Sequence, residues 1–375
     1  MEVLRHEFRK IVQFPALIGF VVLSLGLNIV FVTSMKNSYA NFIAEASRIT
    51  CVHLGADFER RAAELEPGHY TDMLRAQVAA QEDVLYRFSA VLLGDGIIEV
   101  HGLDGMPARL MGEKYRRFQY AVDARRQAGD SMTLYFAGAT HVQHQRLFGY
   151  TMGLLLFQGV ALASLMMLLS VGYEQASKTD YIVYATKVGR RVNRHKLVAG
   201  VVSALGAYGF LAAITLAVYF AANPMGGTWG SSVSSGFNYI RDGFATRPFV
   251  TWFGFTVWQY LLGIIGVSVG LVICFALMAY AVGLVVRNSY IGLLVVVGIN
   301  GVMFVLPFFS PMVMLNYVLA SSPVWLVLTR ALWFTDGGAN VLWPHFEIWG
   351  VGVSFVVLVL VAVLVGRRFY QVDVA

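Results

Sequence analysis

The sequence predicts an all-α membrane protein with six transmembrane helices, an N-terminal amphipathic interfacial helix, and a mainly helical extracellular domain after the first span. Of the 375 residues, 57% are hydrophobic and 13% are charged, whereas an average soluble domain carries about 25% charged residues. Apolar runs of about 20 residues, the length that crosses a bilayer, recur along the chain. So few charges cannot cover a soluble particle of this size, and part of the surface must therefore face lipid.

The balance of charge is basic, with a formal net charge of +6. In a membrane protein an excess of Lys and Arg marks cytoplasmic loops, and we prefer this interpretation to nucleic-acid binding. The two cysteines, Cys51 in a polar stretch and Cys274 in an apolar one, have no metal-ligand spacing. We expect neither a disulfide, nor a metal site, nor a nucleic-acid partner.

Residues 1–35 contain the first span, which runs from about 14 to 32. Pro15 lies in its first turn, where a missing N–H costs least. The segment before it alternates apolar with basic side chains, which predicts a helix that lies along the cytoplasmic interface. The alternating residues are Val3, Leu4, Arg5, Phe8, Arg9, Lys10 and Ile11.

Residues 36–147 form the one long polar block, with 13 Lys or Arg and 14 Asp or Glu. Segments 40–65, 71–93 and 107–128 have apolar residues at helical spacing. Between the last two, glycine-rich turns flank Ile97–Val100, which predicts a short strand there. We expect a small domain of its own.

The third part, residues 148–375, holds five further spans. We expect them at about 148–173 and 197–222, within 252–286 and 290–309, and at about 348–365. A Gly/Ser-rich loop occupies 223–248. Residues 310–345 hold two apolar segments, about 312–319 and 324–333, each too short to cross a bilayer. These broken segments predict interfacial or re-entrant half-helices.

The distribution of basic residues predicts the orientation. If both termini are cytoplasmic, the short inner segments hold 12 Lys or Arg and the short outer loops hold three. Such a bias is typical of a multi-pass protein in the plasma membrane. The block 36–147 then lies outside the cell, because long domains are translocated largely regardless of charge.

No motif for chemistry occurs. The sequence has no phosphate-binding G-x-x-x-x-G-K-[ST], no nucleophile elbow and no H-E-x-x-H, so we expect no enzyme activity and no cofactor in this chain. We interpret His141 and His144 as a solvated interfacial pair rather than as metal ligands. The polar residues of the spans suit helix-packing hydrogen bonds better than a substrate site; they are Asn28, Gln158, Gln259 and Asn300.

The basic loop 173–196 carries the most information. An acidic residue, Glu174, follows the second span, and Lys196 opens the third. Between them a short amphipathic stretch precedes Gly189-Arg190-Arg191. Its apolar side chains lie at three and four spacing outside the bilayer, which predicts a protein partner or the membrane surface. They are Tyr181, Ile182, Tyr184 and Ala185.

This pattern resembles the loop of ABC-2 type permeases, the membrane subunits of type V ABC exporters. The resemblance would make residues 175–187 the coupling helix, followed by the Gly189-Arg190 turn. It extends over the whole chain in layout, but only this loop and the tail that begins at Arg367 carry it in residues. The usual Gly-Thr after the acidic residue is replaced by Ser177-Lys178-Thr179. A large first outer domain occurs in part of the family, including members tied to peptide or antibiotic export.

The resemblance implies a permease without its own ATPase, which exports a peptide, a lipid or a hydrophobic small molecule. A cytoplasmic ABC ATPase subunit would bind ATP and Mg, and a second permease copy or a related permease would complete the exporter. The residues expected to couple to the ATPase are Glu174, Lys178, Asp180, Tyr181, Tyr184, Arg190 and Arg191.

Two alternatives remain open. The first is a membrane-anchored receptor that uses 36–147 as a sensor, with a signalling domain supplied by a partner. The second is a secondary transporter with a site at the membrane midplane, which predicts charged residues inside the spans and inverted repeats. An ATPase encoded beside this chain would favour the exporter over both.

Overall fold

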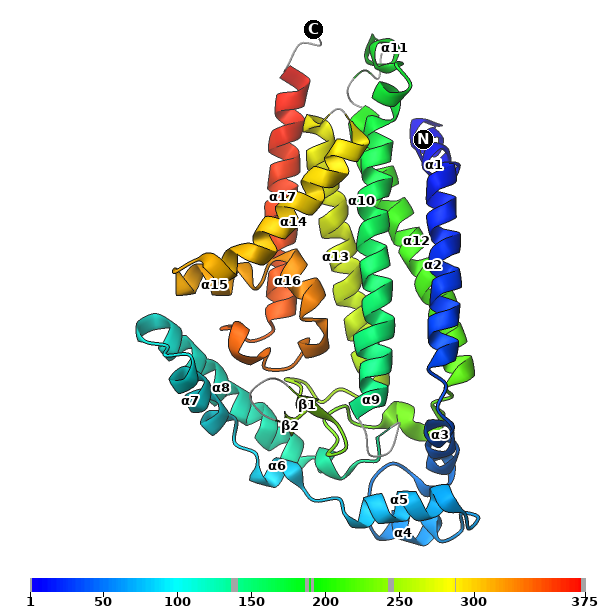
Figure 1. The fold of residues 1–375 in the computed structure, drawn as a ribbon, viewed down its shortest axis with the longest axis vertical. Coiled ribbons are helices and arrows are strands. Elements are labelled where there is room, and N and C mark those ends of the chain that lie inside the picture. Colours follow the sequence, from blue (N-terminus) through cyan, green and yellow to red (C-terminus); the bar gives the residue numbers. More distant parts are fainter. Residues whose placement is uncertain are drawn as a thin grey trace.

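The computed structural model describes residues 2–135, 141–185, 189, 192–241, 246–286 and 288–371. The fold is mostly helical (Figure 1), and six helices are long and apolar enough to cross a membrane. They are α2 (Pro15–Ser34), the continuous helix 142–176 that includes α10 (Met152–Ala176), α12 (Val192–Ala222), α13 (Val257–Val285), α14 (Ser289–Phe309) and α17 (Phe346–Gln371). The prediction of six apolar spans is confirmed, and the helices indicate a multi-pass membrane protein.

The two central helices are α10 and α13. In the most apolar stretch of each helix, 72% of the residues are buried for the helix that includes α10 and 61% for α13. The corresponding share is only 11% to 22% for α17, α14 and α2. Glycines allow this close packing, because they have no side chain. A Cβ added at Gly159 would lie 2.6 Å from the Tyr208 ring, and one added at Gly270 would lie 2.6 Å from Val351. The peripheral helices keep apolar faces exposed, as expected where lipid replaces a protein neighbour.

Buried amides join three of the spans. Asn28 of α2 and Gln158 of α10 exchange two hydrogen bonds of 2.9 and 2.7 Å, and Asn28 also donates to the Thr215 hydroxyl of α12. The expected packing role of these amides is confirmed. Gln259 differs from the expectation, because it caps its own helix by accepting from the Thr256 amide at the start of α13. The Asn300 amide group donates to the Val296 carbonyl within α14 and to the Met278 sulfur of α13 at 3.2 Å, which is a contact between two spans.

Short helices fill the segment that follows α2, at the end of the bundle away from the N-terminus (Figure 1). They are α3 (Ser38–Thr50), α4 (Ala56–Ala62), α5 (His69–Ala79), α6 (Val84–Arg87), α7 (Ala90–Val100) and α8 (Gly105–Gln127). Helices α6 to α8 share a small core that also takes in Val250, Tyr317 and Leu342. Residues from the later connections therefore complete this part of the fold, which 36–147 does not build alone.

The expected strand at Ile97–Val100 is wrong, because these residues end α7. The Ser89 hydroxyl caps this helix by accepting from the Leu92 amide, and Gly94 lets it lie directly against Tyr115 of α8. The expected helices 40–65 and 71–93 are each divided. The first breaks where Cys51 adopts a φ of 67°, a conformation that ends regular helix.

The connections between later spans also contain structure. In the Gly/Ser-rich loop, β1 (Tyr239–Arg241) pairs antiparallel with β2 (Thr246–Pro248), and Ile240 faces Arg247. The segment before α17 holds the short helices α15 (Val313–Leu319) and α16 (Pro323–Leu328). Two short helices in 310–345 are thus confirmed, and the second ends earlier than expected.

Candidate functional site

One end of the bundle gathers the predicted coupling loop, the N-terminal helix and the C-terminal end of α17 (Figure 1). We call it the charged end and define it by α1 (Glu2–Val12), the last turns of α10, α11 (Asp180–Ala185) and the first turns of α12. Helix α1 packs against both α10 and α12 and buries Glu7 and Ile11 between them. Three segments distant in sequence therefore meet here.

A buried ion-pair cluster joins these segments. Glu174 of α10 accepts a hydrogen bond from Lys196 of α12, and its second oxygen accepts from Lys10 of α1 at 2.9 Å. Lys10 also donates to Glu7 at 2.7 Å. We call Glu7, Lys10, Glu174 and Lys196 the Glu174 cluster.

The burial of the Glu174 cluster makes its pairing energetically important. Glu7, Glu174 and Lys196 are almost fully buried, and Lys10 is mostly so. Removal of one partner from a buried pair leaves an uncompensated charge, at a cost of about 3–5 kcal/mol. Burial alone would lower the pKa of Lys10, but the Glu7 and Glu174 carboxylates outweigh it, so the pKa lies above its usual value. The cluster therefore holds α1, α10 and α12 together as one unit.

The turn after α10 sets the direction of α11. The Thr179 amide donates to the Glu174 carbonyl at 2.9 Å and the Lys178 amide donates to the Gln175 carbonyl at 3.1 Å. This is the Schellman pattern of helix termination, and Lys178 takes the left-handed position with a φ of 54°. The expected coupling helix 175–187 is therefore corrected: 175 and 176 end α10, and the new helix begins at Asp180.

Helix α11 exposes apolar side chains at the surface of the protein. The exposed fractions of Tyr181 and Ile182 are 65% and 69%. Beside the helix lies a hollow of about 520 Å³ that extends to the turn before α14. Its lining includes two residues expected in the coupling surface, Lys178 and Tyr181; the others are Phe14, Leu169, Gly172, Gln175, Ala176, Asn288, Ser289 and Tyr290.

The predicted coupling residues divide into four groups. Lys178 and Tyr181 lie together at the surface, whereas Glu174 is buried and can act on a partner only through its neighbours. Asp180 and Tyr184 belong to α11, but their side chains lie outside the description. Arg190 and Arg191 lie outside the described residues.

Sequence reasoning missed the internal pairing of Glu174 with Lys196. A signal was present, because consecutive spans run antiparallel and these residues end one span and begin the next. The contribution of Lys10 had no such signal, since the position of α1 beside α10 is set by tertiary packing.

The expected solvated pair of histidines is wrong for His144. This ring is buried, with Nδ1 at 2.6 Å from the Tyr135 hydroxyl and 3.2 Å from the Asn238 amide nitrogen. It stacks on the Tyr260 ring and packs at a tilt against the Phe249 ring. Among the described residues no group of three or more His, Cys, Asp or Glu side chains could hold a metal ion.

A second buried charged cluster lies at the opposite end of the bundle. Asp336 accepts from Tyr115 at 2.6 Å and from Arg247 at 2.5 Å. Lys114 donates to three main-chain carbonyls, those of Asp336, Gly338 and Val341, at 3.0, 2.9 and 2.7 Å. Lys114, Tyr115, Arg247 and Asp336, which we call the Asp336 cluster, join α8 and β2 to the segment before α17.

The Asp336 cluster is buried as a unit. Burial lowers the pKa of Lys114 to about 7, against the opposing effect of the Asp336 carboxylate. Burial alone would raise the pKa of Asp336, but Arg247 and Lys114 outweigh it and the pKa lies below its usual value. No sequence signal predicted the Asp336 cluster, because its members are far apart along the chain. Lys114 and Asp336, for example, are separated by 222 residues.

Comparisons of the chain with protein-family models, with characterised proteins and with solved structures find no match.

Proposed function

We propose that this chain is the membrane permease subunit of an ATP-driven ABC exporter of the ABC-2 type, powered by a separate ATPase. The observation that carries the proposal is α11, a short helix at the charged end with Tyr181 and Ile182 exposed. Exposed apolar side chains on a short helix are the kind of surface that a docking partner buries. The resemblance of loop 173–196 to a coupling loop adds to this argument.

The Glu174 cluster supplies a means of force transmission. A push on α11 reaches α10 through the tight turn at Lys178. Because α10 is joined to α1 and α12 by the buried ion pairs, these helices move together, and packed interfaces shift between discrete arrangements rather than deforming continuously. ATP and Mg belong to the partner, and this chain contributes mechanical coupling rather than catalysis.

We also propose an orientation of the chain in the membrane and a set of partners. The charged end faces the cytoplasm of a plasma-membrane protein, with α1 along the interface, both termini inside, and 36–147 outside. Two permease copies, or this chain with a related permease, form the path. The cargo is a peptide, a lipid or a hydrophobic small molecule.

Ion-coupled transport is the weaker candidate. It requires ionisable side chains deep inside the spans. In the described parts of the six spans, charged residues occur only in the terminal turns; they are Arg146, Glu174, Arg194, Lys196, Glu347, Arg367 and Arg368.

Co-purification of an ABC ATPase with this chain from native membranes tests the proposal. Two variants, Arg190→Glu/Arg191→Glu and deletion of 178–186, are expected to lose the ATPase while still reaching the membrane. A matched control is Arg60→Glu/Arg61→Glu, an adjacent exposed pair on α4 at the opposite end, which should retain it. If both loop variants keep the ATPase bound and export intact, the proposed coupling role is wrong.

A further inference from the structure

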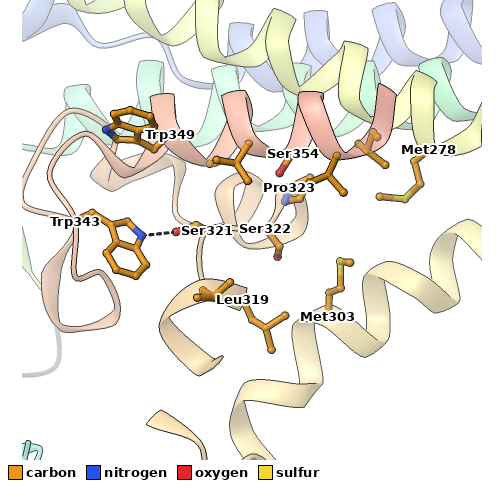
Figure 2. A pocket seen from close by; sticks show the side chains of 14 residues that line it. Met278, Met303, Leu319, Ser321, Ser322, Pro323, Trp343, Trp349 and Ser354 are labelled. Atoms are coloured by element: carbon orange, nitrogen blue, oxygen red, sulfur yellow. Dashed lines mark hydrogen bonds between the residues drawn. The ribbon is translucent and has the colours of Figure 1, made fainter. Parts of the chain in front are cut away.

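A large apolar hollow lies between α13, α14, α17 and the connection that carries α15 and α16 (Figure 2). Its volume is about 610 Å³, within the range of about 300–1,000 Å³ that is typical of small-ligand sites. Figure 2 shows Met303 and Leu319 on one side and Trp349 and Ser354 of α17 on the other. We call it the α14–α17 hollow.

A proline in α14 helps to form this hollow. Pro307 has no N–H, so the carbonyl of Met303, four residues earlier, loses its helical partner. The indole N–H of Trp325 in α16 donates to that carbonyl at 3.2 Å, and the Trp325 ring lies 5.3 Å from the Phe304 ring. Helix α14 is thus held against α16, and it leans away from the other long helices toward α15 (Figure 1).

The lining of the hollow selects hydrocarbon. Among the described residues it contains no charged side chain. Of its hydroxyls, that of Ser321 already accepts from the Trp343 indole N–H at 3.1 Å. The other two hydroxyls belong to Ser322 and Ser354. A charged ligand would lose its water here and find no opposite charge, at a cost of several kcal/mol. Met278 and Met303 add flexible thioethers that adapt to an irregular apolar ligand.

The hollow opens toward the lipid phase. The exposed fractions of Trp349, Val353 and Val318 in its lining are 64%, 57% and 54%. They lie beside α14 and α17, the two spans with the smallest buried shares. Hydrocarbon is therefore the phase that meets the opening in a bilayer.

The tryptophans give the hollow a direction. Trp343 lies just before α17 and Trp349 lies in its first turn, and the lining continues along that helix to Leu358. Tryptophan prefers the level of the lipid headgroups, so a headgroup belongs beside these rings and a chain extends from them along α17.

We propose that the α14–α17 hollow holds one acyl chain of a bilayer phospholipid, with the headgroup at the level of Trp343 and Trp349. The chain enters sideways between α14 and α17 and fills the space that the lean of α14 leaves. This site is separate from α11 and does not depend on the proposed coupling to an ATPase.

Photolabelling of the full chain in nanodiscs tests this site. The probe is a phosphatidylcholine with a diazirine on one acyl chain, present as a trace in unlabelled phosphatidylcholine. We expect label on residues 318–323, of which Val318 lies at the opening and the others lie behind it, as well as on 349–358. Ser354→Trp places an indole in the hollow and should lower labelling of 318–323 by about tenfold.

Val356→Trp is the matched control. Two residues on, it lies about 200° around the same helix, outside the lining, and should leave the labelling of 318–323 unchanged. Met303→Trp fills the hollow from α14 and replaces Ser354→Trp if that variant fails to fold.

Two outcomes would overturn the proposal. One is label confined to the outward faces of α14 and α17 and equal in all variants, which means surrounding lipid only. The other is a disulfide between copies from Val353→Cys together with unlabelled 318–323, which means that a second copy covers the opening.

Discussion

At the scale of single residues, each end of this molecule contains one cluster of buried charged side chains. The Glu174 cluster joins α1, α10 and α12, and the Asp336 cluster joins α8 and β2 to the segment before α17. In both, a carboxylate accepts hydrogen bonds from two partners on different elements. Both clusters therefore join segments that are distant in the sequence.

The substitution Asp336→Asn tests the second cluster. It removes the carboxylate that accepts from Arg247, so the buried guanidinium loses this negative charge. We expect the free energy of unfolding to fall by about 3–5 kcal/mol, measured by denaturant unfolding in detergent. Asp57→Asn is the control, because its pair with Arg60 is exposed, and it should change stability little.

The difference in the free energy of unfolding between the wild type and Asp336→Asn should change with pH in a defined direction. The pKa of Asp336 lies below its usual value of 3.8, since Arg247 and Lys114 outweigh the effect of burial. A depressed folded-state pKa stabilises the fold above the unfolded-state value, and this stabilisation is lost as the pH falls through the folded-state pKa. The advantage of the wild type over Asp336→Asn should therefore be complete above about pH 3.8 and shrink below it. A difference that stays constant down to pH 2 would contradict the assigned role.

At the scale of elements, the long spans could be predicted and the breaks in the polar block could not. An apolar run of bilayer length has one stable form in lipid, since every backbone group must be paired within it. In the polar block, Gly94-Asp95-Gly96 resembles a turn, but the close approach of Tyr115 keeps these residues helical. Local composition cannot reveal such a tertiary contact.

The two glycines of α7 provide a matched test of that contact. A Cβ at Gly94 would lie 2.6 Å from the Tyr115 side chain, whereas one at Gly96 would meet nothing within 4 Å. We expect Gly94→Ala to destabilise the protein by about 1–3 kcal/mol through overpacking. Gly96→Ala should stabilise it by about 0.5–1 kcal/mol, because alanine favours a helix interior. Equal effects of the two substitutions on the unfolding midpoint would show that α7 does not pack on α8 in this way.

At the scale of the whole molecule, the six spans separate two unlike ends. The charged end holds α1, α11 and the basic tail, and the other holds the helices of the polar block (Figure 1). The sequence predicts both ends through its charge distribution. It could not predict that later connections, through Val250 and Leu342, complete the core of α6 to α8, because these contacts join segments far apart along the chain.

Thiol labelling tests the proposed orientation. In a background without Cys51 and Cys274, cysteines replace the exposed Tyr86 and Ile182 at opposite ends. A membrane-impermeant maleimide should label position 86 on intact cells, because that end is expected outside. Position 182 should react only after the cells are permeabilised. The reverse pattern would invert the orientation and rule out a cytoplasmic ATPase at α11.

The central claim is that a separate ATPase binds at α11. The most direct test is a photo-crosslinking amino acid at position 182 in native membranes, with position 86 as the control and mass spectrometry to identify the partner. We predict that an ABC ATPase is crosslinked from position 182 and not from position 86. Efficient crosslinking from position 182 to lipid or to other proteins, with no ABC ATPase among the products, would contradict the claim.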